Sequence, residues 1–245
     1  MSKQNRRKVR VEILNNEKIK ITENGPYLVS GNVPLEEKII FHKGHENTYS
    51  DGRSFPQQES YALCRCGHSK SMPFCDGSHS KHHFDGTETA SNEPYLNEAE
   101  LMEGPGLLLT DKEDLCAFAR FCHKRLGNVW DLTEMSDDPD CREAAIQAAC
   151  DCPAGRLVAW DKDTKEAIEP EYEPSIVVLQ DADRQCSGPL WVRGGIPIES
   201  SDGSLYEIRN RVTLCRCGES ENKPFCDAAH VNSEFDDHHL PASNK

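Results

Sequence analysis

Three cysteines and a histidine stand close together twice in this chain, in short polar stretches of nearly the same sequence. The first stretch, CRCGHSKSMPFCDGSH, covers residues 64–79, and the second, CRCGESENKPFCDAAH, covers residues 215–230. Thiolates and imidazole are ligands that zinc and iron both accept, so each stretch predicts a metal site with four ligands. The predicted ligands are Cys64, Cys66, Cys75 and His79 in the first stretch, and Cys215, Cys217, Cys226 and His230 in the second.

Two kinds of metal centre use such ligands. Structural zinc accepts three cysteines and one histidine, although its ligands usually come from two distant Cys-x-x-Cys knuckles. In this chain each set lies within one loop of sixteen residues. The spacing leaves two alternatives open, which are a zinc-stabilised structural or adaptor protein without redox activity and an iron-sulfur protein.

The first stretch resembles the motif of the CDGSH, or mitoNEET-like, iron-sulfur family. It matches at Cys64, Cys66, Ser69, Pro73, Cys75, Asp76, Gly77, Ser78 and His79. The second matches at Cys215, Cys217, Ser220, Pro224, Cys226, Asp227 and His230, but Ala228 stands where the motif has glycine. The resemblance implies a 2Fe-2S cluster at each site, held by three thiolates and one imidazole. Members with one motif pair as dimers, so it also implies an internal pseudo-dimer here.

Other residues of the motif have predicted structural roles. Asp76 is expected to be the N-cap of the helical turn that carries His79, and Gly77 lets the backbone approach closely. Ser69 and Ser220 are expected either to donate a hydrogen bond to a cluster sulfur or to lie exposed in the loop.

The formal charges of the two motifs differ. Charged residues sum to +1 in the first motif (Arg65, Lys70, Asp76) and to −1 in the second (Arg216, Lys223, Glu219, Glu221, Asp227). We expect these side chains to be exposed. Because negative charge opposes the addition of an electron, the cluster at Cys215 should have the lower reduction potential.

The repeat extends upstream of both motifs, where GPYLVSGNVPL from Gly25 matches GPLWVRGGIPI from Gly188. Each copy predicts a first strand (VRVEI at Val9, SIVVLQ at Ser175), a Gly-Pro turn, a second strand, a loop and a short strand that leads into the Cys-x-Cys pair. The loop is longer in the first copy, where it includes FHKGHENTYSDGRSF. We therefore expect two small β-rich units that pair with each other.

The middle of the chain carries a different set of cysteines, in LCAFARFCHK and in CREAAIQAACDCPAGRL. This segment resembles small bacterial ferredoxins and the divergent single-cluster ferredoxin-like domain, but Ala119 stands where the middle cysteine of the first run would be. The resemblance leaves Cys116, Cys122 and Cys152 as ligands of a 3Fe-4S cluster, or of a 4Fe-4S cluster with Cys150 as the fourth ligand. Cys141 is a weaker candidate. The alternative is a helical linker domain with buried, unliganded thiols.

These observations predict an α+β fold with three segments. Residues 1–92 form the first CDGSH unit and residues 171–245 the second, arranged as an internal pseudo-dimer. Residues 93–170 form an inserted α/β, ferredoxin-like domain with an Ala-rich helix from Arg142.

Composition limits the classes of function. The chain has 245 residues and a formal net charge of −14, which disfavours binding to nucleic acid. The basic N-terminal cluster is expected to be a frayed terminus (Lys3, Arg6, Arg7, Lys8, Arg10). No apolar stretch suits a membrane span or a signal peptide, and twelve cysteines without an export signal indicate a reducing compartment. We therefore expect a cytoplasmic monomer without membrane attachment.

No arrangement of residues indicates organic catalysis, because the sequence has no defensible Ser-His-Asp order, phosphate-binding glycine loop or dinucleotide fingerprint. We therefore expect a protein that is not an enzyme. It would transfer electrons to a redox protein or hand clusters to an apo-acceptor.

Overall fold

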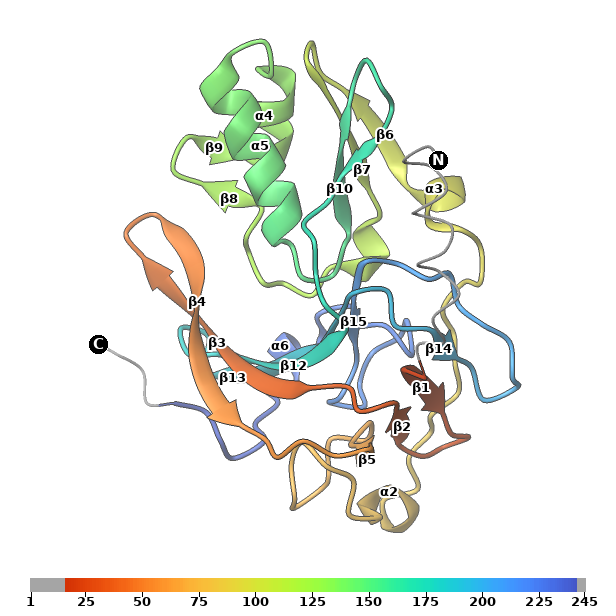
Figure 1. Ribbon diagram of the computed structural model, residues 1–245. Coiled ribbons are helices and arrows are strands. Elements are labelled where there is room, and N and C mark those ends of the chain that lie inside the picture. The colour runs from red at the N-terminus through yellow and green to blue at the C-terminus, as the bar shows by residue number, and fades with distance from the viewer. Residues whose placement is uncertain (1–15, 242–245) are drawn as a thin grey trace.

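Strands make up most of the molecule, with helices concentrated in its middle segment. The computed structural model describes residues 16–241. It is a mixed α+β fold in which the middle segment, drawn from yellow through green to teal, lies above two sheets that the repeat copies build together (Figure 1). None of the helices in this described part is long and apolar enough to cross a membrane.

The two repeat copies exchange strands. One sheet has the order β14-β1-β2-β5, from β1 (Lys18–Ile21), β2 (Tyr27–Ser30), β5 (Ser60–Leu63) and β14 (Ile198–Glu199). The other has the order β15-β13-β12-β3-β4, from β3 (Leu35–Lys43), β4 (Glu46–Ser54), β12 (Ser175–Asp181), β13 (Cys186–Arg193) and β15 (Arg211–Leu214). The parallel strand β14 pairs Ile198 with Ile19, and the parallel strand β3 pairs Leu35 with Ile176. Leu35 and Ile198 hold the same place in the repeat, so each copy completes the sheet of the other in equivalent register.

A shared core lies between these two sheets. Strand β2 alternates buried and exposed residues, so Tyr27 and Val29 point inward toward Ile176, Val178 and Leu190 of the second copy. Strand β12 is buried along its whole length, because the middle segment covers the other face. This explains why β12 reads as a continuous apolar run rather than an alternating one.

The middle segment forms a third sheet, with its two longest helices on one face and two short helical turns on the other. The sheet has the order β11-β10-β7-β6, from β6 (Glu100–Glu103), β7 (Leu107–Asp111), β10 (Leu157–Asp161) and β11 (Ala167–Ile168). The helices are α3 (Tyr95–Glu98), the 3-10 turn η1 (Glu113–Leu115), α4 (Val129–Glu134) and α5 (Pro139–Asp151), with a small ribbon of β8 (His123–Lys124) and β9 (Gly127–Asn128) beside them. Helix α5 begins where the Asp138 carboxylate accepts from the amides of Asp140 and Cys141, and its face of Ala145, Ala148 and Ala149 packs on the sheet.

The structure contains some of the predicted strands and differs from the prediction in one loop. The strand at Ser175 and the two short strands before the Cys-x-Cys pairs are present as β12, β5 and β15. The strand predicted at Val9 and the basic N-terminal cluster lie outside the described residues. The long loop predicted in the first copy is wrong, because it folds as the β3–β4 hairpin. Strand β4 is polar and half exposed throughout, so it has no apolar alternation that would reveal a strand. The segment boundaries at 92/93 and 170/171 stay predictions.

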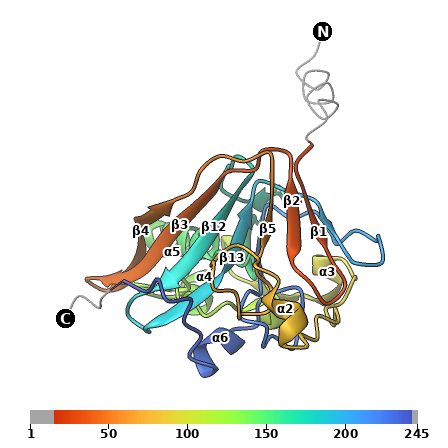
Figure 2. The same ribbon diagram turned by 90° about the horizontal axis from the view of Figure 1, so that it is seen from below.

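The two Cys-x-Cys turns cross in backbone contact. Gly67 and Gly218 have left-handed φ angles of 79° and 88°. A Cβ atom on Gly67 would lie 2.3 Å from the carbonyl oxygen of Cys217, and one on Gly218 would lie 2.8 Å from that of Cys66. Only glycine therefore fits at the crossing. The helices that follow the two turns, α2 (Ser78–Lys81) and α6 (Ala229–Asn232), lie at the same end of the molecule (Figure 2).

We predict that Gly67→Ala destabilises the protein much more than Gly203→Ala. Both positions have a left-handed φ angle, but a Cβ on Gly203 has no neighbour within 4 Å. The control should therefore cost only backbone strain, about 1 kcal/mol, whereas Gly67→Ala adds overpacking against a neighbouring backbone and should cost about 3 kcal/mol or more. Urea denaturation of both variants measures the difference. Equal losses of unfolding free energy would show that the crossing is loosely packed.

Candidate metal centres

Both cysteine loops fold back on the strands that lead into them. The amide of Cys64 donates to the carbonyl of Pro73 at 2.8 Å, and the amide of Cys75 donates to that of Ala62 at 2.9 Å. The second copy repeats these contacts, from Cys215 to Pro224 at 2.8 Å and from Cys226 to Thr213 at 2.9 Å. This return brings the third cysteine of each motif beside the Cys-x-Cys pair.

The predicted ligands stand in close pairs. Sγ atoms of Cys64 and Cys66 are 3.7 Å apart, and those of Cys215 and Cys217 are 3.5 Å apart. In both copies the third cysteine Sγ lies 3.4 Å from the histidine Nδ1, in the pairs Cys75–His79 and Cys226–His230. A tetrahedral metal ion with bonds of about 2.0–2.3 Å separates its ligands by about 3.3–3.8 Å. Each pair is therefore spaced to share one metal ion, and two pairs per loop fit the two irons of a 2Fe-2S cluster. Within residues 16–241, no three or more Cys, His, Asp or Glu side chains are grouped for one ion.

The two thiols of each Cys-x-Cys pair lie within hydrogen-bond distance of each other. The thiol of Cys66 can donate to Cys64, which lowers the pKa of Cys64 to about 6 and raises that of Cys66. The same contact from Cys217 lowers the pKa of Cys215 to about 7. Since the thiolate is the metal-binding form, one ligand of each pair is already favoured for binding.

The aspartate of each motif connects two parts of its loop through backbone amides. The carboxylate of Asp76 accepts from the amides of Lys70 and Ser78, both at 2.9 Å, and Asp227 does the same for Glu221 and Ala229 at 2.8 and 3.0 Å. The predicted N-cap role of Asp76 is wrong. The N-cap of α2 is Gly77 and that of α6 is Ala228, because the left-handed residue after the aspartate starts each helix.

The serines of the loops do not point their hydroxyl groups at a sulfur. Ser69 Oγ donates to the carbonyl of Phe74 at 2.6 Å, and Ser220 Oγ donates to that of Phe225 at 2.7 Å. The sulfur of Cys75 accepts instead from the backbone amide of Gly77 at 3.5 Å, and Cys226 accepts from Ala228 at the same distance. Both serines are buried and brace the loops, rather than lying exposed.

The two loops differ in how far they are enclosed. Cys75 and His79 are half-buried, whereas Cys226 and His230 are buried. The difference comes from the middle segment, since Ala117 and Ala154 pack directly against Cys226. Burial lowers the pKa of His230 to about 4, so its ring stays neutral to low pH.

Three of the middle cysteines line one cavity. Cys116, Cys122 and Cys152 surround one small cavity together with Ala119 and other residues of the same two loops. Phe118 and Arg120 hold left-handed φ angles of 54° and 62° between the first two cysteines. The structure does not bring the other two candidates to this cavity. The Cys150 thiol faces the carbonyl of Ile168 at 3.5 Å, and Cys141 lies in the first turn of α5.

Several buried arginines were not anticipated. Arg65 and Arg216, expected to be exposed, are 2% and 1% exposed. Each lies between two inward-facing cysteines, so its side chain points to the opposite side of the loop and meets backbone carbonyls. The recurrence of arginine between the cysteines of both motifs is the signal that could have indicated a structural role. Arg156, which also lines the middle cavity and pairs with Asp111 at 2.5 Å, has no such signal.

We predict that acid removes metal from the first loop before the second. Imidazole must be neutral to bind metal, and protons in solvent reach the half-buried His79 more easily than the enclosed His230. Because the pKa of His230 is lowered to about 4, its share of metal binding is lost only as pH falls toward that value. His79→Cys should therefore slow metal loss at mildly acidic pH more than His230→Cys does, as measured by metal content against pH. Equal protection by both substitutions would mean that enclosure does not control release.

Comparison with known families agrees with this arrangement of sites. A family model described as the iron-binding zinc finger of CDGSH type matches residues 24–80 and 187–231. A model described as a divergent 4Fe-4S mono-cluster matches residues 102–162. The searches of curated proteins and of solved structures give no match. The chain is an iron-sulfur-binding protein of the CDGSH type, in which two CDGSH segments flank a divergent 4Fe-4S mono-cluster domain.

Proposed function

We propose that this protein is an electron carrier with three iron-sulfur clusters. Two 2Fe-2S clusters would be held by the three cysteines and one histidine of each CDGSH loop, and a third cluster by Cys116, Cys122 and Cys152. The observation that carries this proposal is that the three ligand sets are in continuous packing contact. Iron-sulfur clusters supply one-electron chemistry when bound. The residues described below hold them close together and exclude water.

Contact between the two CDGSH sites comes from the crossing of their turns. Four ligands, Cys64, Cys66, Cys215 and Cys217, belong to one buried cluster of side chains that also contains Met72 and Phe235. The exchange of β3 and β14 between the two sheets supports an internal pseudo-dimer, in which one chain supplies both halves.

Contact between the second CDGSH site and the middle cavity comes from small residues. Ala117 and Ala154 lie against Cys226, and Cys152 packs on the same group. Arg211 fixes this contact, because its guanidinium donates to the carbonyls of Ala149 and Cys152, both at 2.6 Å. Strand β15 therefore holds the C-terminal end of α5 four residues before Cys215.

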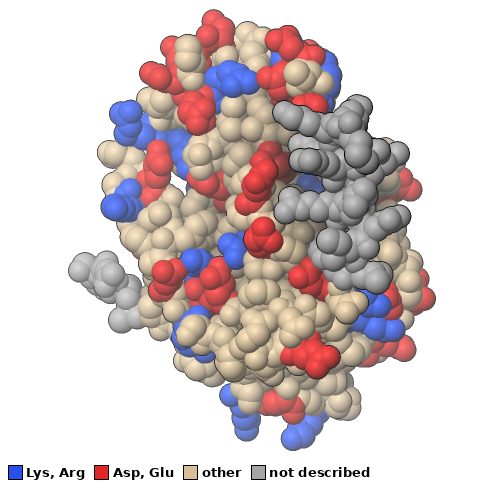
Figure 3. Space-filling model, in the orientation of Figure 1, with Lys and Arg blue, Asp and Glu red and all other residues tan. Residues whose placement is uncertain are grey.

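The exposure of the sites favours electron transfer over the transfer of whole clusters. A cluster leaving the second loop would have to pass the middle segment, whereas an electron needs only close packing between sites. Cys75 and His79 of the first loop are half-buried, and so are Cys116, Cys122 and Cys152, so a redox partner would come closest to a ligand at the first loop or at the middle cavity. On the face shown in Figure 3, Lys and Arg side chains are scattered among Asp and Glu.

We also propose that the protein is not an enzyme, because the cysteines and histidines of the three sites are accounted for as cluster ligands.

The middle cavity suits a 3Fe-4S cluster, because it gathers three cysteines. The matched family model describes a 4Fe-4S domain, which would need a fourth ligand from outside this set. Cys150 would have to leave the carbonyl of Ile168 to provide it.

We predict that Cys116→Ser, Cys122→Ser and Cys152→Ser each lower the iron content without removing the two 2Fe-2S signals. Cys150→Ser and Cys141→Ser are the matched controls and should leave the iron content unchanged, because neither thiol lines the cavity. Iron and sulfide analysis with electron paramagnetic resonance of anaerobically purified protein measures both. Freshly purified protein should be red-brown and bleach with dithionite. A colourless protein with stoichiometric zinc would contradict the proposal, and iron confined to the CDGSH loops would contradict the third cluster.

A further inference from the structure

The arginine of each Cys-Arg-Cys turn occupies the same local position in both copies. Arg65 lies 5.6 Å from the ring centre of Phe84, and Arg216 lies 5.2 Å from that of Phe235. Each guanidinium also donates a hydrogen bond to the residue 21 positions later in the chain. This residue is Gly86 in the first copy and Asp237 in the second. The two loops thus place a buried cation in equivalent positions beside equivalent ligands.

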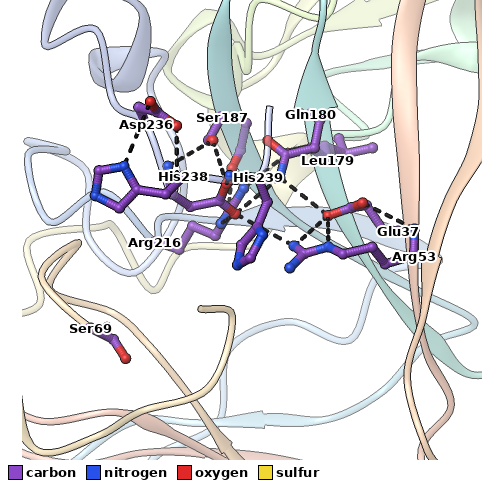
Figure 4. Close-up of polar contacts among 12 residues, drawn as sticks. Glu37, Arg53, Ser69, Leu179, Gln180, Ser187, Arg216, Asp236, His238 and His239 are labelled. Carbon is purple, nitrogen blue, oxygen red and sulfur yellow. Dashed lines mark hydrogen bonds and ion pairs between the residues drawn. The ribbon is translucent and has the colours of Figure 1, made fainter. Parts of the chain in front are cut away.

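In the second copy this cation is paired. Arg216 Nη1 donates to Asp237 Oδ2 at 2.6 Å, and the side chains of the two residues are 1% and 0% exposed. The carboxylate of Asp237 also accepts from Gln180 Nε2 and Ser187 Oγ. Figure 4 shows how the network continues through Gln180 to Glu37 and Arg53. Two arginines and two carboxylates therefore share one network, in which Arg216, Asp237 and Glu37 are buried and Arg53 is half-buried, and their formal charges cancel.

In the first copy the cation has no carboxylate. Among the described residues, Arg65 donates only to carbonyls, to Gly86 at 2.5 Å and to Thr22 at 3.4 Å, and its Nε has no hydrogen-bond partner. Asp85 precedes Gly86 but is exposed, and its carboxylate accepts from Thr87 instead. The first loop thus retains one buried positive charge that the second loop neutralises.

We infer that this difference at positions 86 and 237 sets the reduction potentials of the two CDGSH sites apart, with Arg65 and the Arg216–Asp237 pair as potential-setting residues. The inference rests on the proposed function, since it concerns clusters held by the two loops. An added electron makes a cluster more negative, so a buried unpaired cation favours the reduced form. The site at Cys64 therefore has the higher potential. A low-potential one-electron donor protein reduces it first, and each transfer oxidises the donor by one electron and reduces one site by one electron.

The cause differs from the exposed charges of the motifs, although both give the same order of potentials. Exposed charges are screened by salt, whereas charges as deeply buried as Arg65, Arg216 and Asp237 are screened much less. The difference between the two potentials should therefore persist from about 0.05 M to about 0.5 M salt.

Potentiometric titration of the full-length protein, followed by electron paramagnetic resonance of the two 2Fe-2S signals, tests the inference. The wild type should show two separate one-electron steps that differ at least tenfold in equilibrium constant, which is about 59 mV for one electron. Asp237→Asn leaves Arg216 unpaired and should raise the lower step toward the higher one. Arg65→Gln removes the unpaired charge and should lower the higher step. Because Arg65→Gln leaves the second loop intact, it decides the question if Asp237→Asn fails to fold.

The matched control is Asp236→Asn, which removes the neighbouring exposed carboxylate and should shift neither step. Two 2Fe-2S signals with unchanged potentials in both test variants would overturn the inference while leaving the proposed function standing. A difference that disappears at high salt would overturn it as well and assign the effect to Glu219, Glu221 and other exposed charges. Wild-type protein without two 2Fe-2S signals would overturn the proposed function together with the inference.

Discussion

Both CDGSH sites depend on the backbone contact between the two Cys-x-Cys turns. Because Gly67 approaches the carbonyl of Cys217 and Gly218 approaches that of Cys66, neither turn can move outward without separating from the other. The contact buries Cys64, Cys66, Cys215 and Cys217 together and thereby gives four predicted metal ligands a common buried environment. Strand exchange makes such an approach possible, since each turn leaves a sheet that contains a strand of the other copy.

Arg211 is one of the cations that connect the middle segment to the second CDGSH unit, beside Arg120 and Arg209. Arg211 lies in β15, and its guanidinium donates to carbonyl oxygens that the C-terminal end of α5 leaves without helical partners. Glu169 pairs with the same guanidinium at 2.8 Å, so the buried charge is neutralised. The end of α5 is also the place from which Cys152 turns into its cavity. A change at Arg211 would therefore act on the packing between two ligand sets rather than on either set alone.

Local features of the sites could be predicted from the sequence, and features that depend on distant segments could not. The pairing of Cys75 with His79 follows from their spacing of four residues within one loop. In the structure, Cys75 Sγ lies 3.4 Å from His79 Nδ1. The burial of Arg216 depends on Leu179, Gly188 and Asp237, which come from two other strands and the C-terminal segment. The enclosure of Cys226 likewise depends on residues more than 70 positions away, Ala154 among them. Nothing within the second motif shows that another segment will cover it.

The two copies have the same ligand geometry although one residue of the motif differs between them. Ala228 replaces the motif glycine yet holds a φ angle of 72°, close to the 85° of Gly77. A Cβ at Gly77 would meet nothing within 4 Å, so this position requires a left-handed backbone but not the absence of a side chain. Alanine in this conformation costs about 1 kcal/mol of backbone strain. The Asp227 carboxylate holds the turn in place, because it accepts hydrogen bonds from the amides of Glu221 and Ala229. Ligand geometry is therefore insensitive to the residue that starts the helix. Chemical differences between the sites must arise from what surrounds the loops, namely the small residues of the middle segment and the buried charges beside the Cys-Arg-Cys turns.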